Sequence, residues 1–350
     1  MNIALITGIT GQDGSYLAEY LLEIGYKVYG IVRRNSAVFH YERLDHLRNS
    51  PYLSLHYGDL TDPLCIYQII SKMIEENKNA LCFEVYNLGA QSHVGISFKN
   101  PTYTTSVDAF GPLNILEVIA HLPPQIKSKF RFYQAGTSEM YGKVLENPQN
   151  EETPFNPQSP YACAKVFAHH ITVNYRNAYN IFACNGILFN HESPRRGKNF
   201  VTQKVIDFAK KYKNNQMNNV NTKPLELGNL YSKRDWGHAQ DYVKAMHLML
   251  QQNKPDDYVI STGMTYSVKE FVEKVFQKLN IDLEWQGEEL YEQAINKENG
   301  DVLIVINPKY FRPCEVDLLL GDSSKARREL GWVPLHDLDS LIECMLFNEK

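Results

Sequence analysis

The sequence predicts an α/β protein with a doubly wound parallel sheet and a smaller second α/β domain. Short apolar runs recur from the start of the chain to about Ser261, and segments with helical periodicity separate them. The first apolar run ends in a cluster of glycines. This alternation is typical of sheets whose parallel strands carry helices on both faces.

Each expected strand is a short apolar run that ends near a turn signal, and each expected helix shows a 3.6-residue period. The first helix ends at Gly25, a plausible C-terminal cap. The expected strands are Ile3–Thr7, Lys27–Val32, Leu53–Tyr57, Phe83–Leu88, Phe130–Ala135, Ile181–Leu188 and Tyr258–Ser261. The expected helices are Tyr16–Ile24, Pro63–Glu76, Thr104–His121, Ser159–Tyr179 and His238–Gln252.

The alternation weakens after Leu188, which predicts a second domain built from separate pieces of the chain. Residues 190–235 are rich in loops and charge, and Asn214–Asn221 is polar enough for an exposed loop tip. Helical segments recur at Val268–Leu279 and Ser323–Leu330. We expect residues 1–189 and 236–263 to form the first domain, with the strand at Tyr258 returning to its sheet. Residues 190–235 and 264–350 would form the second.

Composition excludes several classes of function. The 350 residues are 43% hydrophobic and 22% charged, as in ordinary globular proteins. The net charge of −4 argues against nucleic acid or a membrane surface as the main partner. The six cysteines form no Cys-x-x-Cys pair, so we expect no metal site, no disulfide framework and a cytoplasmic location. No apolar run approaches the ~20 residues that span a bilayer, and the first residues lack a basic leader.

The glycine cluster predicts a dinucleotide site. Gly8-Ile-Thr-Gly11-Gln-Asp-Gly14 follows the first strand and opens the first helix. Pyrophosphate oxygens must reach backbone N–H groups there, and any Cβ would obstruct them. The Gly-x-x-Gly-x-x-Gly spacing resembles the short-chain dehydrogenase/reductase superfamily. A glycine turn alone can be only a tight turn, but strand, glycines, helix and strand in this order favour a Rossmann-type domain.

The end of the second strand indicates which dinucleotide binds. An acidic residue at this point would bind the ribose 2′-hydroxyl of NAD, whereas the chain has Arg33 and Arg34. Two guanidinium groups suit a 2′-phosphate, so NADP is favoured over NAD. The alternative interpretation is two solvated surface arginines.

A tyrosine and a lysine indicate redox chemistry on an alcohol. Tyr161 and Lys165 share one helix face at spacing i, i+4, after a candidate N-cap at Ser159 and Pro160 at the first helical position. There the ammonium can lower the pKa of the phenol and make it a proton acceptor. The pair alone suggests nicotinamide-dependent oxidation, although this spacing is also common by chance.

A second base extends the chemistry beyond oxidation. Gln134–Gly142 begins as a strand and ends as a loop, which places Thr137, Ser138 and Glu139 at the carboxyl edge of the sheet. A carboxylate there can remove a proton next to a newly made ketone. The combination therefore favours a sugar dehydratase over a simple dehydrogenase.

With these motifs the chain resembles the extended short-chain dehydrogenase/reductases of the NAD(P)-dependent epimerase/dehydratase group. Within that group it is similar to the GDP-mannose 4,6-dehydratase family. The matches run from Gly8 to Gly331, with small departures at Gly136 and Cys314. The matching segments are Gly8–Leu17, Val32–Arg34, Asn87–Ser92, Thr137–Gly142, Asn190–Gly197, Lys233–Ala239 and Arg312–Asp317.

The resemblance implies a reaction: GDP-mannose loses water to give GDP-4-keto-6-deoxymannose, the first step towards GDP-fucose or GDP-rhamnose. Tyr161 would take the C4 hydroxyl proton, with Lys165 supporting it, while hydride passes to NADP⁺. Glu139 would take the C5 proton and return a proton to the departing C6 hydroxyl, and the hydride would return to C6. Thr137 would bind near O4, and Ser138 would position the C6 hydroxyl. Reduction of the 4-ketone to GDP-rhamnose remains open as a second activity.

The resemblance also assigns binding residues. Those implied for the cofactor are Gly8, Thr10, Gly11, Gln12, Asp13, Gly14, Arg33, Arg34, Asp59, Leu60, Leu88, Gly89, Ala90, Ser92, Tyr103, Tyr161, Lys165, His191 and Arg196. Those implied for GDP-mannose are Asn190, Lys204, Arg234, Arg312 and Glu315. Without the resemblance, Lys204 would be a solvated helix residue and Arg312 a surface loop charge. In this family the basic loop Arg195–Lys198 reaches a neighbouring subunit's cofactor, which implies a homo-oligomer, either a dimer or a tetramer.

Two other classes of protein remain to be weighed. A 4-epimerase would keep Tyr161 and Lys165 but has no use for Glu139, and a dTDP-glucose 4,6-dehydratase typically has Asp in place of Ser138. A non-enzymatic NADP-binding regulator could keep the glycine turn, but the full catalytic set weighs against it. The adjacent pair His169-His170 points in two directions on one helix, so we interpret it as structural rather than metal-binding.

Overall fold

A seven-stranded sheet forms the centre of the computed structural model, which describes residues 1–33, 42–217 and 222–348. The strand order is β11-β6-β5-β4-β1-β2-β3, and each neighbouring pair is parallel. The strands are β1 (Asn2–Thr7), β2 (Lys27–Val32), β3 (Leu53–Tyr57), β4 (Cys82–Asn87), β5 (Phe130–Ala135), β6 (Phe182–Leu188) and β11 (Asp257–Ile260). The doubly wound parallel sheet is confirmed, and so is the return of the strand at Tyr258 to it.

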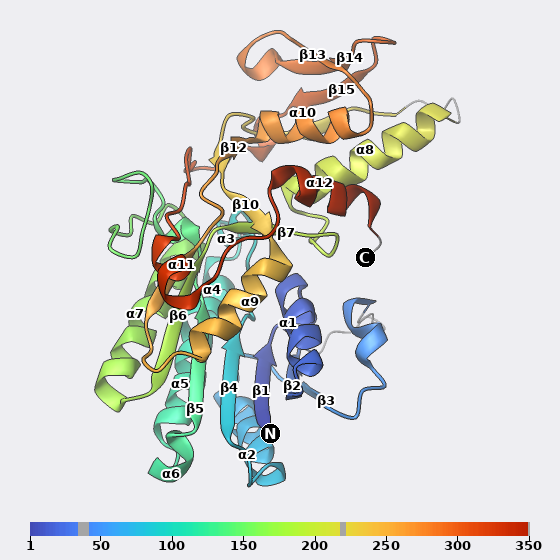
Figure 1. Ribbon diagram of the computed structural model, residues 1–350. Coiled ribbons are helices and arrows are strands. Elements are labelled where there is room, and N and C mark those ends of the chain that lie inside the picture. The colour runs from blue at the N-terminus through green and yellow to red at the C-terminus, as the bar shows by residue number, and fades with distance from the viewer. Residues whose placement is uncertain (34–41, 218–221, 349–350) are drawn as a thin grey trace.

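Helices cover both faces of this sheet (Figure 1). Because side chains alternate along a strand, Ala4 and Ile6 of β1 enter one core while Ile3 and Leu5 enter the other. The first core is covered by α1 (Gln12–Glu23), α9 (Ala239–Leu250) and α11 (Ser324–Leu330). The second is covered by α2 (Pro63–Glu76), α5 (Gly111–Ala120) and α7 (Pro160–Tyr179). Short helices α3 (Val94–Ser97) and α6 (Pro124–Lys127) lie in the connections.

The helix predicted at Thr104–His121 is interrupted. The chain forms α4 (Pro101–Thr105), then a π-helical turn η2 at Ser106–Phe110, and only then α5. A π turn accommodates one extra residue in a helix and is frequent at functional sites. The periodicity was continuous enough to suggest a single helix, so the break at η2 is a correction.

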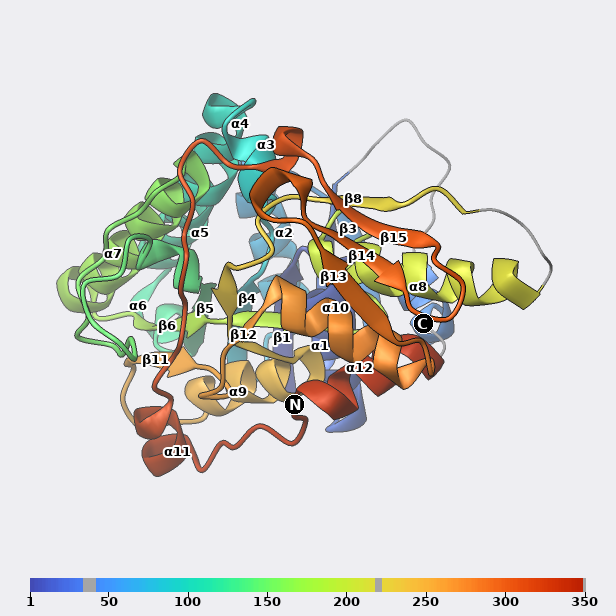
Figure 2. The ribbon, with the colours of Figure 1, turned by 90° about the horizontal axis from the view of Figure 1, so that it is seen from above.

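A smaller second domain packs above the carboxyl ends of the strands (Figures 1 and 2). Its core lies between helices α8 (Val201–Met217), α10 (Val268–Lys278) and α12 (Leu338–Phe347) and a four-stranded sheet. That sheet has the order β13-β14-β15-β8. Its strands are β8 (Leu225–Leu227), β13 (Leu283–Gln286), β14 (Gln293–Asn296) and β15 (Val302–Ile306). There are also two two-stranded sheets in the described residues. In one, β7 (Asn190–Glu192) pairs with β10 (Trp236–His238), and in the other, β9 (Lys233–Arg234) pairs with β12 (Tyr266–Ser267).

Two segments differ from the sequence prediction. Helix α8 occupies part of a stretch that we expected to be loops, and it extends through Asn214 to Met217, while residues 218–221 lie outside the described part. Ala326 and Leu330 of α11 pack into the first core, beside α9, rather than into the second domain to which the predicted division assigned them.

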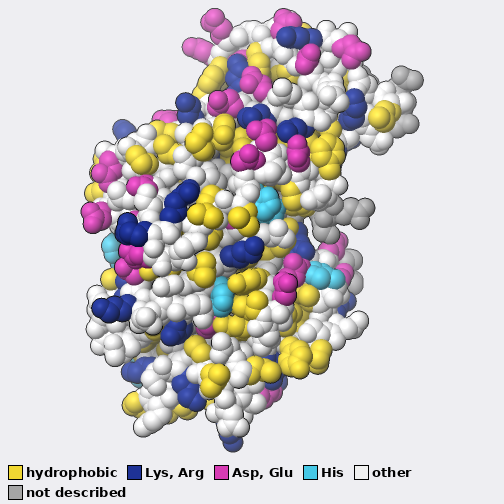
Figure 3. Space-filling view, viewed as in Figure 1, with side chains coloured by type: hydrophobic (Ala, Val, Ile, Leu, Met, Phe, Trp, Pro, Cys, Tyr) yellow, Lys and Arg dark blue, Asp and Glu magenta, His cyan; other side chains and the backbone are white. Residues whose placement is uncertain are grey.

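The surface and the helices bear on possible partners. On the face shown in Figure 3, lysine and arginine side chains are interspersed with aspartate and glutamate rather than gathered in one large basic field. Of the helices in the described ranges, none is long and apolar enough to cross a membrane.

Candidate active site

A cavity of about 1310 Å³ is lined by residues from the carboxyl edge of the large sheet and by residues of the second domain. Every site residue predicted from the sequence lines it, apart from Arg34, which lies outside the described residues. The structure therefore brings together residues from the turns after β1 and β5, from α7 and α8, and from the loop at residue 312. Their individual roles remain predictions.

The glycine turn forms a backbone cradle at one end of the cavity. Gly8 has a φ of +66°, and a Cβ on it would lie 2.8 Å from the Gly89 backbone nitrogen. A Cβ on Gly14 would lie 2.3 Å from the Gly8 carbonyl oxygen. Gly11 caps α1 with no side chain over the helix N-terminus, which leaves backbone N–H groups facing the cavity. These residues fit the pyrophosphate of a dinucleotide.

Two arginines line the part of the cavity beyond this cradle. Arg33 donates a hydrogen bond to the Tyr103 hydroxyl, and its guanidinium lies 6.0 Å from that ring. Arg43 also lines the cavity and donates to the Thr10 carbonyl oxygen at 3.0 Å. The sequence analysis missed Arg43, which lies ten residues beyond Arg33 with no motif around it. Both cations suit a phosphate at the ribose 2′ position.

A partly buried ion pair connects the start of α1 to the second part of the site. Asp13 Oδ2 lies 2.8 Å from His191 Nε2, and Gln12 donates to the His191 carbonyl oxygen at 3.0 Å. Burial alone would raise the pKa of Asp13 and lower that of His191, but the charge of each acts on the other. The attraction outweighs burial, so the pKa of Asp13 is lowered and that of His191 is raised. We infer a charged pair.

Helix α7 begins as predicted and positions Tyr161 and Lys165. Ser159 caps it by accepting the Ala162 N–H at 3.1 Å, and Pro160 follows. The Lys165 ammonium donates to the Ala135 carbonyl oxygen at 2.9 Å and lies 5.9 Å from the centre of the Tyr161 ring.

Burial dominates the ionisation of this pair. It raises the pKa of Tyr161, and the negative charges of Asp108 and Glu139 raise it further, whereas a Thr137 hydrogen bond and Arg196 lower it. Burial lowers the pKa of Lys165, and Asp108 opposes that change. We expected Lys165 to lower the pKa of Tyr161. In this structure burial has the larger effect, and it raises that pKa.

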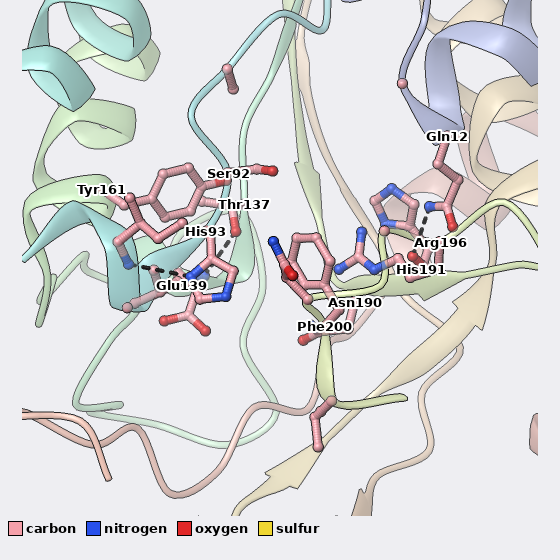
Figure 4. Close-up of a pocket in the computed structure, with 18 of the residues that line it drawn as sticks. Gln12, Ser92, His93, Thr137, Glu139, Tyr161, Asn190, His191, Arg196 and Phe200 are labelled. Carbon is pink, nitrogen blue, oxygen red and sulfur yellow. Dashed lines mark hydrogen bonds between the residues drawn. The ribbon is translucent and has the colours of Figure 1, made fainter. Parts of the chain in front are cut away.

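The turn after β5 places the second base. Thr137 caps the 3₁₀ turn η3 (Ser138–Met140) by accepting the Glu139 N–H at 3.2 Å. The Glu139 side chain is 10% exposed, and its Oε1 lies 3.5 Å from Arg312 Nη1 and 4.0 Å from Arg234 Nη2. In Figure 4, Tyr161, Thr137 and Glu139 lie on one side of the cavity, opposite residues of the 190–200 segment.

The second domain supplies cations to this side of the cavity. Lys204 of α8 lies with its ammonium 5.0 Å from the Tyr310 ring, and Arg234 is buried. Glu315 Oε1 accepts the Arg312 N–H at 2.8 Å, so this predicted substrate residue also shapes the loop. Together Lys204, Arg234 and Arg312 can neutralise a diphosphate, and the arginines can do so with forked contacts.

Histidines left without a catalytic role have structural contacts. His93 accepts the Ile96 N–H at 3.2 Å and thereby caps α3. His169 packs edge-on against Phe155, and its Nε2 lies 3.8 Å from Asp257 Oδ2. Within the described residues no cluster of three potential metal ligands occurs.

Comparison with known proteins identifies the family. The family model described as GDP-mannose 4,6 dehydratase matches residues 5–345. The chain belongs to this family. It is 53% identical to the GDP-mannose 4,6 dehydratase of Drosophila melanogaster over 98% of this chain and 85% of that protein. It is 51% identical to the Homo sapiens protein of the same name, over 99% of this chain and 90% of that one.

Solved structures share the fold at lower identity. A dTDP-glucose 4,6-dehydratase from Bacillus anthracis, in complex with NAD, superposes with a TM-score of 0.76 at 20% identity, covering 99% of this chain and 95% of that one. A UDP-glucose 4-epimerase from Thermotoga maritima superposes with a TM-score of 0.77 at 21% identity, covering 99% and 97%. At this level of identity the likeness shows that the chain shares the fold of these two enzymes.

Proposed function

We propose that this protein converts GDP-mannose to GDP-4-keto-6-deoxymannose and water, as a hydro-lyase that uses NADP. One observation carries the proposal: two separate proton acceptors, Tyr161 and Glu139, line the same cavity as the glycine cradle. An epimerase needs only the first of these groups. The relatives that share half of the sequence bear the name of this activity.

NADP fits the residues at the cradle end of the cavity. Bound NADP⁺ would supply a hydride acceptor and return the hydride later in the same turnover. The backbone of the glycine turn would bind the pyrophosphate of NADP, and the Arg33 guanidinium would bind the 2′-phosphate. His191 and Arg196 would contact the cofactor from the second part of the site.

The side chains divide the proton transfers between them. Tyr161 takes the proton of the C4 hydroxyl as the C4 hydride leaves, which makes a ketone and acidifies the neighbouring C5–H bond. Glu139 takes the C5 proton and gives a proton to the C6 hydroxyl, which departs as water. The hydride would return to C6, and C5 would take up a proton that balances the one Tyr161 removed from O4, so the sugar loses only H₂O. Thr137 holds O4, and Ser138 holds the C6 hydroxyl.

The nucleotide diphosphate would lie along the second domain. Lys204, Arg234 and Arg312 supply the positive charge, and Asn190 and Glu315 supply contacts to hydroxyl groups. This placement sets the sugar between the diphosphate and the catalytic turn at Glu139.

A homo-oligomer is part of the proposal. Phe110 and Phe167 are 49% and 39% exposed and pack against each other, with ring centres 6.1 Å apart, on neighbouring helical segments. Such an exposed aromatic pair suits contact with a second copy. Arg196 lies against Phe200 and Glu192 in the cavity of its own chain. A mass measurement in solution would distinguish a dimer from a tetramer. A cytoplasmic location is also proposed, since all six cysteines are free.

NMR of the purified protein with GDP-mannose tests the proposal. Formation of GDP-4-keto-6-deoxymannose without added cofactor would support both the dehydratase and a retained NADP. A 4-hydroxyl product that appears only when NADPH is added would reveal reduction to GDP-rhamnose. No conversion with added NADP would contradict the proposed substrate, and dTDP-glucose and UDP-sugars would then be tested.

A further inference from the structure

A buried glutamine outside the cavity connects the segments that carry the proposed base and the proposed phosphate-binding cations. Gln149 is 0% exposed and lies in the loop between the turn η3, which carries Glu139, and helix α7. It is not among the described residues that line the cavity. A buried amide needs hydrogen-bond partners within the protein, and those of Gln149 include a segment that is distant in the sequence, at Leu320.

Both the main chain and the side chain of Gln149 bond to this distant segment. The Gln149 N–H donates to the Leu320 carbonyl oxygen at 2.8 Å, and the Gln149 carbonyl oxygen accepts the Asp322 N–H at 2.8 Å. Its side-chain Oε1 accepts the Leu320 N–H at 2.9 Å, while Nε2 donates to the Glu146 carbonyl oxygen at 2.9 Å. The amide side chain is therefore satisfied on both its oxygen and its nitrogen.

The residues just before Leu320 bond to the strand that carries Arg234. The Lys233 N–H donates to the Asp317 carbonyl oxygen at 2.7 Å, and the Lys233 carbonyl oxygen accepts the Leu319 N–H at 3.1 Å. Lys233 precedes Arg234 in β9, and Arg312 lies a few residues before Asp317. Residues 317–322, the connecting segment, thus hold the two phosphate-binding arginines together through bonds that do not involve Gln149.

The turn that carries Glu139 contacts the same connecting segment. Tyr141, two residues after Glu139, is fully buried in a hydrophobic cluster that includes Leu319. Its hydroxyl donates to the carbonyl oxygen of Asn150, the residue after Gln149, at 2.6 Å. The turn with the base and the segment with the cations are therefore both held by the chain at residues 149 and 150.

We propose that Gln149 is a positioning residue for the elimination step, because it fixes where Glu139 lies relative to the diphosphate site and hence to the C5 proton of the bound sugar. The inference rests on the proposed function, which makes Glu139 the C5 base. Tyr161 is held separately, by α7 packed on β6 of the large sheet. Oxidation at C4 should therefore depend on Gln149 less than proton removal at C5 does.

Gln149→Met tests this role, because methionine keeps the length of the side chain and removes both of its hydrogen bonds. We expect kcat to fall about tenfold, since a small misplacement of a reacting group costs that much or more in rate. The affinity for GDP, measured by calorimetry, should stay nearly unchanged, because Arg234 and Arg312 remain connected through β9.

The kinetic isotope effect with GDP-mannose deuterated at C5 identifies the step that slows. It should rise in Gln149→Met, because removal of the C5 proton then limits the rate more strongly. A variant that had only lost stability would contain less active enzyme, and its kcat would fall with no change in the isotope effect. That result would overturn the proposal.

Asn296→Leu is the matched control. Asn296 is also a buried amide, 1% exposed, whose Oδ1 accepts the Glu298 N–H at 2.9 Å and whose Nδ2 donates to the Tyr212 hydroxyl at 3.0 Å. It lies in β14 and does not line the cavity. The urea midpoint should fall in both variants, whereas the isotope effect should rise only in Gln149→Met. An equal rise in both would refute a specific role for Gln149.

A second variant decides if Gln149→Met does not fold. Tyr141→Phe keeps the buried ring and removes only the hydroxyl that donates to Asn150. It should raise the C5 isotope effect in the same direction and leave the affinity for GDP unchanged. A wild-type isotope effect in Tyr141→Phe would then overturn the proposal.

One readout needs no turnover. Cys314 is exposed in the loop that begins at Arg312, so a fluorine label on its thiol reports on that loop, once Cys163, which is also exposed, is replaced by serine. The fluorine NMR signal should broaden or split in Gln149→Met and stay as in the wild type in the Asn296 control. An unchanged signal in Gln149→Met would contradict the proposed link. Absence of GDP-mannose conversion by the wild type would count against the proposed function alone.

Discussion

Glu139 Oε1 lies 3.5 Å from Arg312 Nη1, so the proposed C5 base and a proposed phosphate-binding cation are in contact. Arg234 approaches the same oxygen at 4.0 Å. The Arg312 side chain is 31% exposed, whereas that of Glu139 is 10% exposed. A diphosphate entering the cavity would compete with Glu139 for these guanidinium groups. Substrate binding would thereby free the carboxylate to accept a proton when the sugar is in place.

Glu139→Gln should abolish water elimination and leave NADP binding intact. The amide keeps the shape of the side chain but cannot accept the C5 proton, and loss of a general base typically costs ~10²–10⁴-fold in rate. The measurement is the rate of GDP-4-keto-6-deoxymannose formation by NMR, together with NADP affinity by calorimetry. Glu146→Gln, in an exposed position of the following loop, is the control. Turnover at the wild-type rate would show that another group is the base.

Arg312→Lys should raise the KM for GDP-mannose more than it lowers kcat. Lysine keeps the charge but loses the forked contact to phosphate oxygens, and we expect about a tenfold rise in KM. Arg328→Lys is the matched control, because that arginine is exposed on α11 and pairs with Glu329. A fall in kcat with KM unchanged would place Arg312 at the reacting sugar rather than at the diphosphate.

Arg33→Ser should weaken binding of NADP about tenfold and affect NAD much less, because only NADP carries the 2′-phosphate. Calorimetry with both dinucleotides gives the ratio. Arg48→Ser provides a control at an exposed arginine that forms an ion pair with Asp45. Equal losses for NADP and NAD would indicate that Arg33 supports the fold of the site through Tyr103 and does not select the cofactor.

Local signals explain what the sequence could predict. The Tyr161–Lys165 spacing places both residues on one face of α7, and the cap at Ser159 marks where that helix begins. The glycine spacing likewise specifies a turn that only residues without a Cβ can form. In each case the determining contacts lie within a few residues along the chain.

Contacts between distant segments could not be predicted in the same way. Arg43 donates to Thr10, and Asp13 pairs with His191, but neither contact has a local pattern. The π turn at Asp108 lies inside a continuous apolar period, so the carboxylate seemed to be one polar residue of an ordinary helix. The apolar face of α8, which includes Val205 and Ile206, is diluted by lysines and asparagines, and the helix was therefore missed.

Gly14→Ala should destabilise the protein although Gly14 lies in a helix. Alanine in a helix normally gains about 1 kcal/mol over glycine. Here its Cβ would lie 2.3 Å from the Gly8 oxygen and 2.6 Å from Ile9 Cα, which are backbone atoms that cannot easily move. We expect a net loss of about 1–3 kcal/mol in urea unfolding. Gly11→Ala, whose Cβ would meet the Gly8 oxygen at 3.1 Å, should cost less. Equal stability of wild type and Gly14→Ala would disprove the close approach.

Asp13→Asn should destabilise the protein more in weakly acidic than in alkaline solution. The pKa of His191 is raised in the folded protein, so its stabilising contribution is complete below the unfolded value of 6.5 and is lost as pH rises through the folded pKa. The pKa of Asp13 is lowered from 3.8, so its contribution is lost only as pH falls through that lower value. The charged pair therefore stabilises the folded protein between these two pH limits.

Losing the hydrogen bond between Asp13 and His191 should cost about 1.5–3 kcal/mol in that pH range. Urea unfolding of both proteins at about pH 6, below the unfolded histidine value, and again in alkaline solution measures the difference. NMR should also show a lower pKa for His191 in the variant. The same loss of stability at both pH values would mean that His191 is neutral throughout and that the pair is an ordinary hydrogen bond.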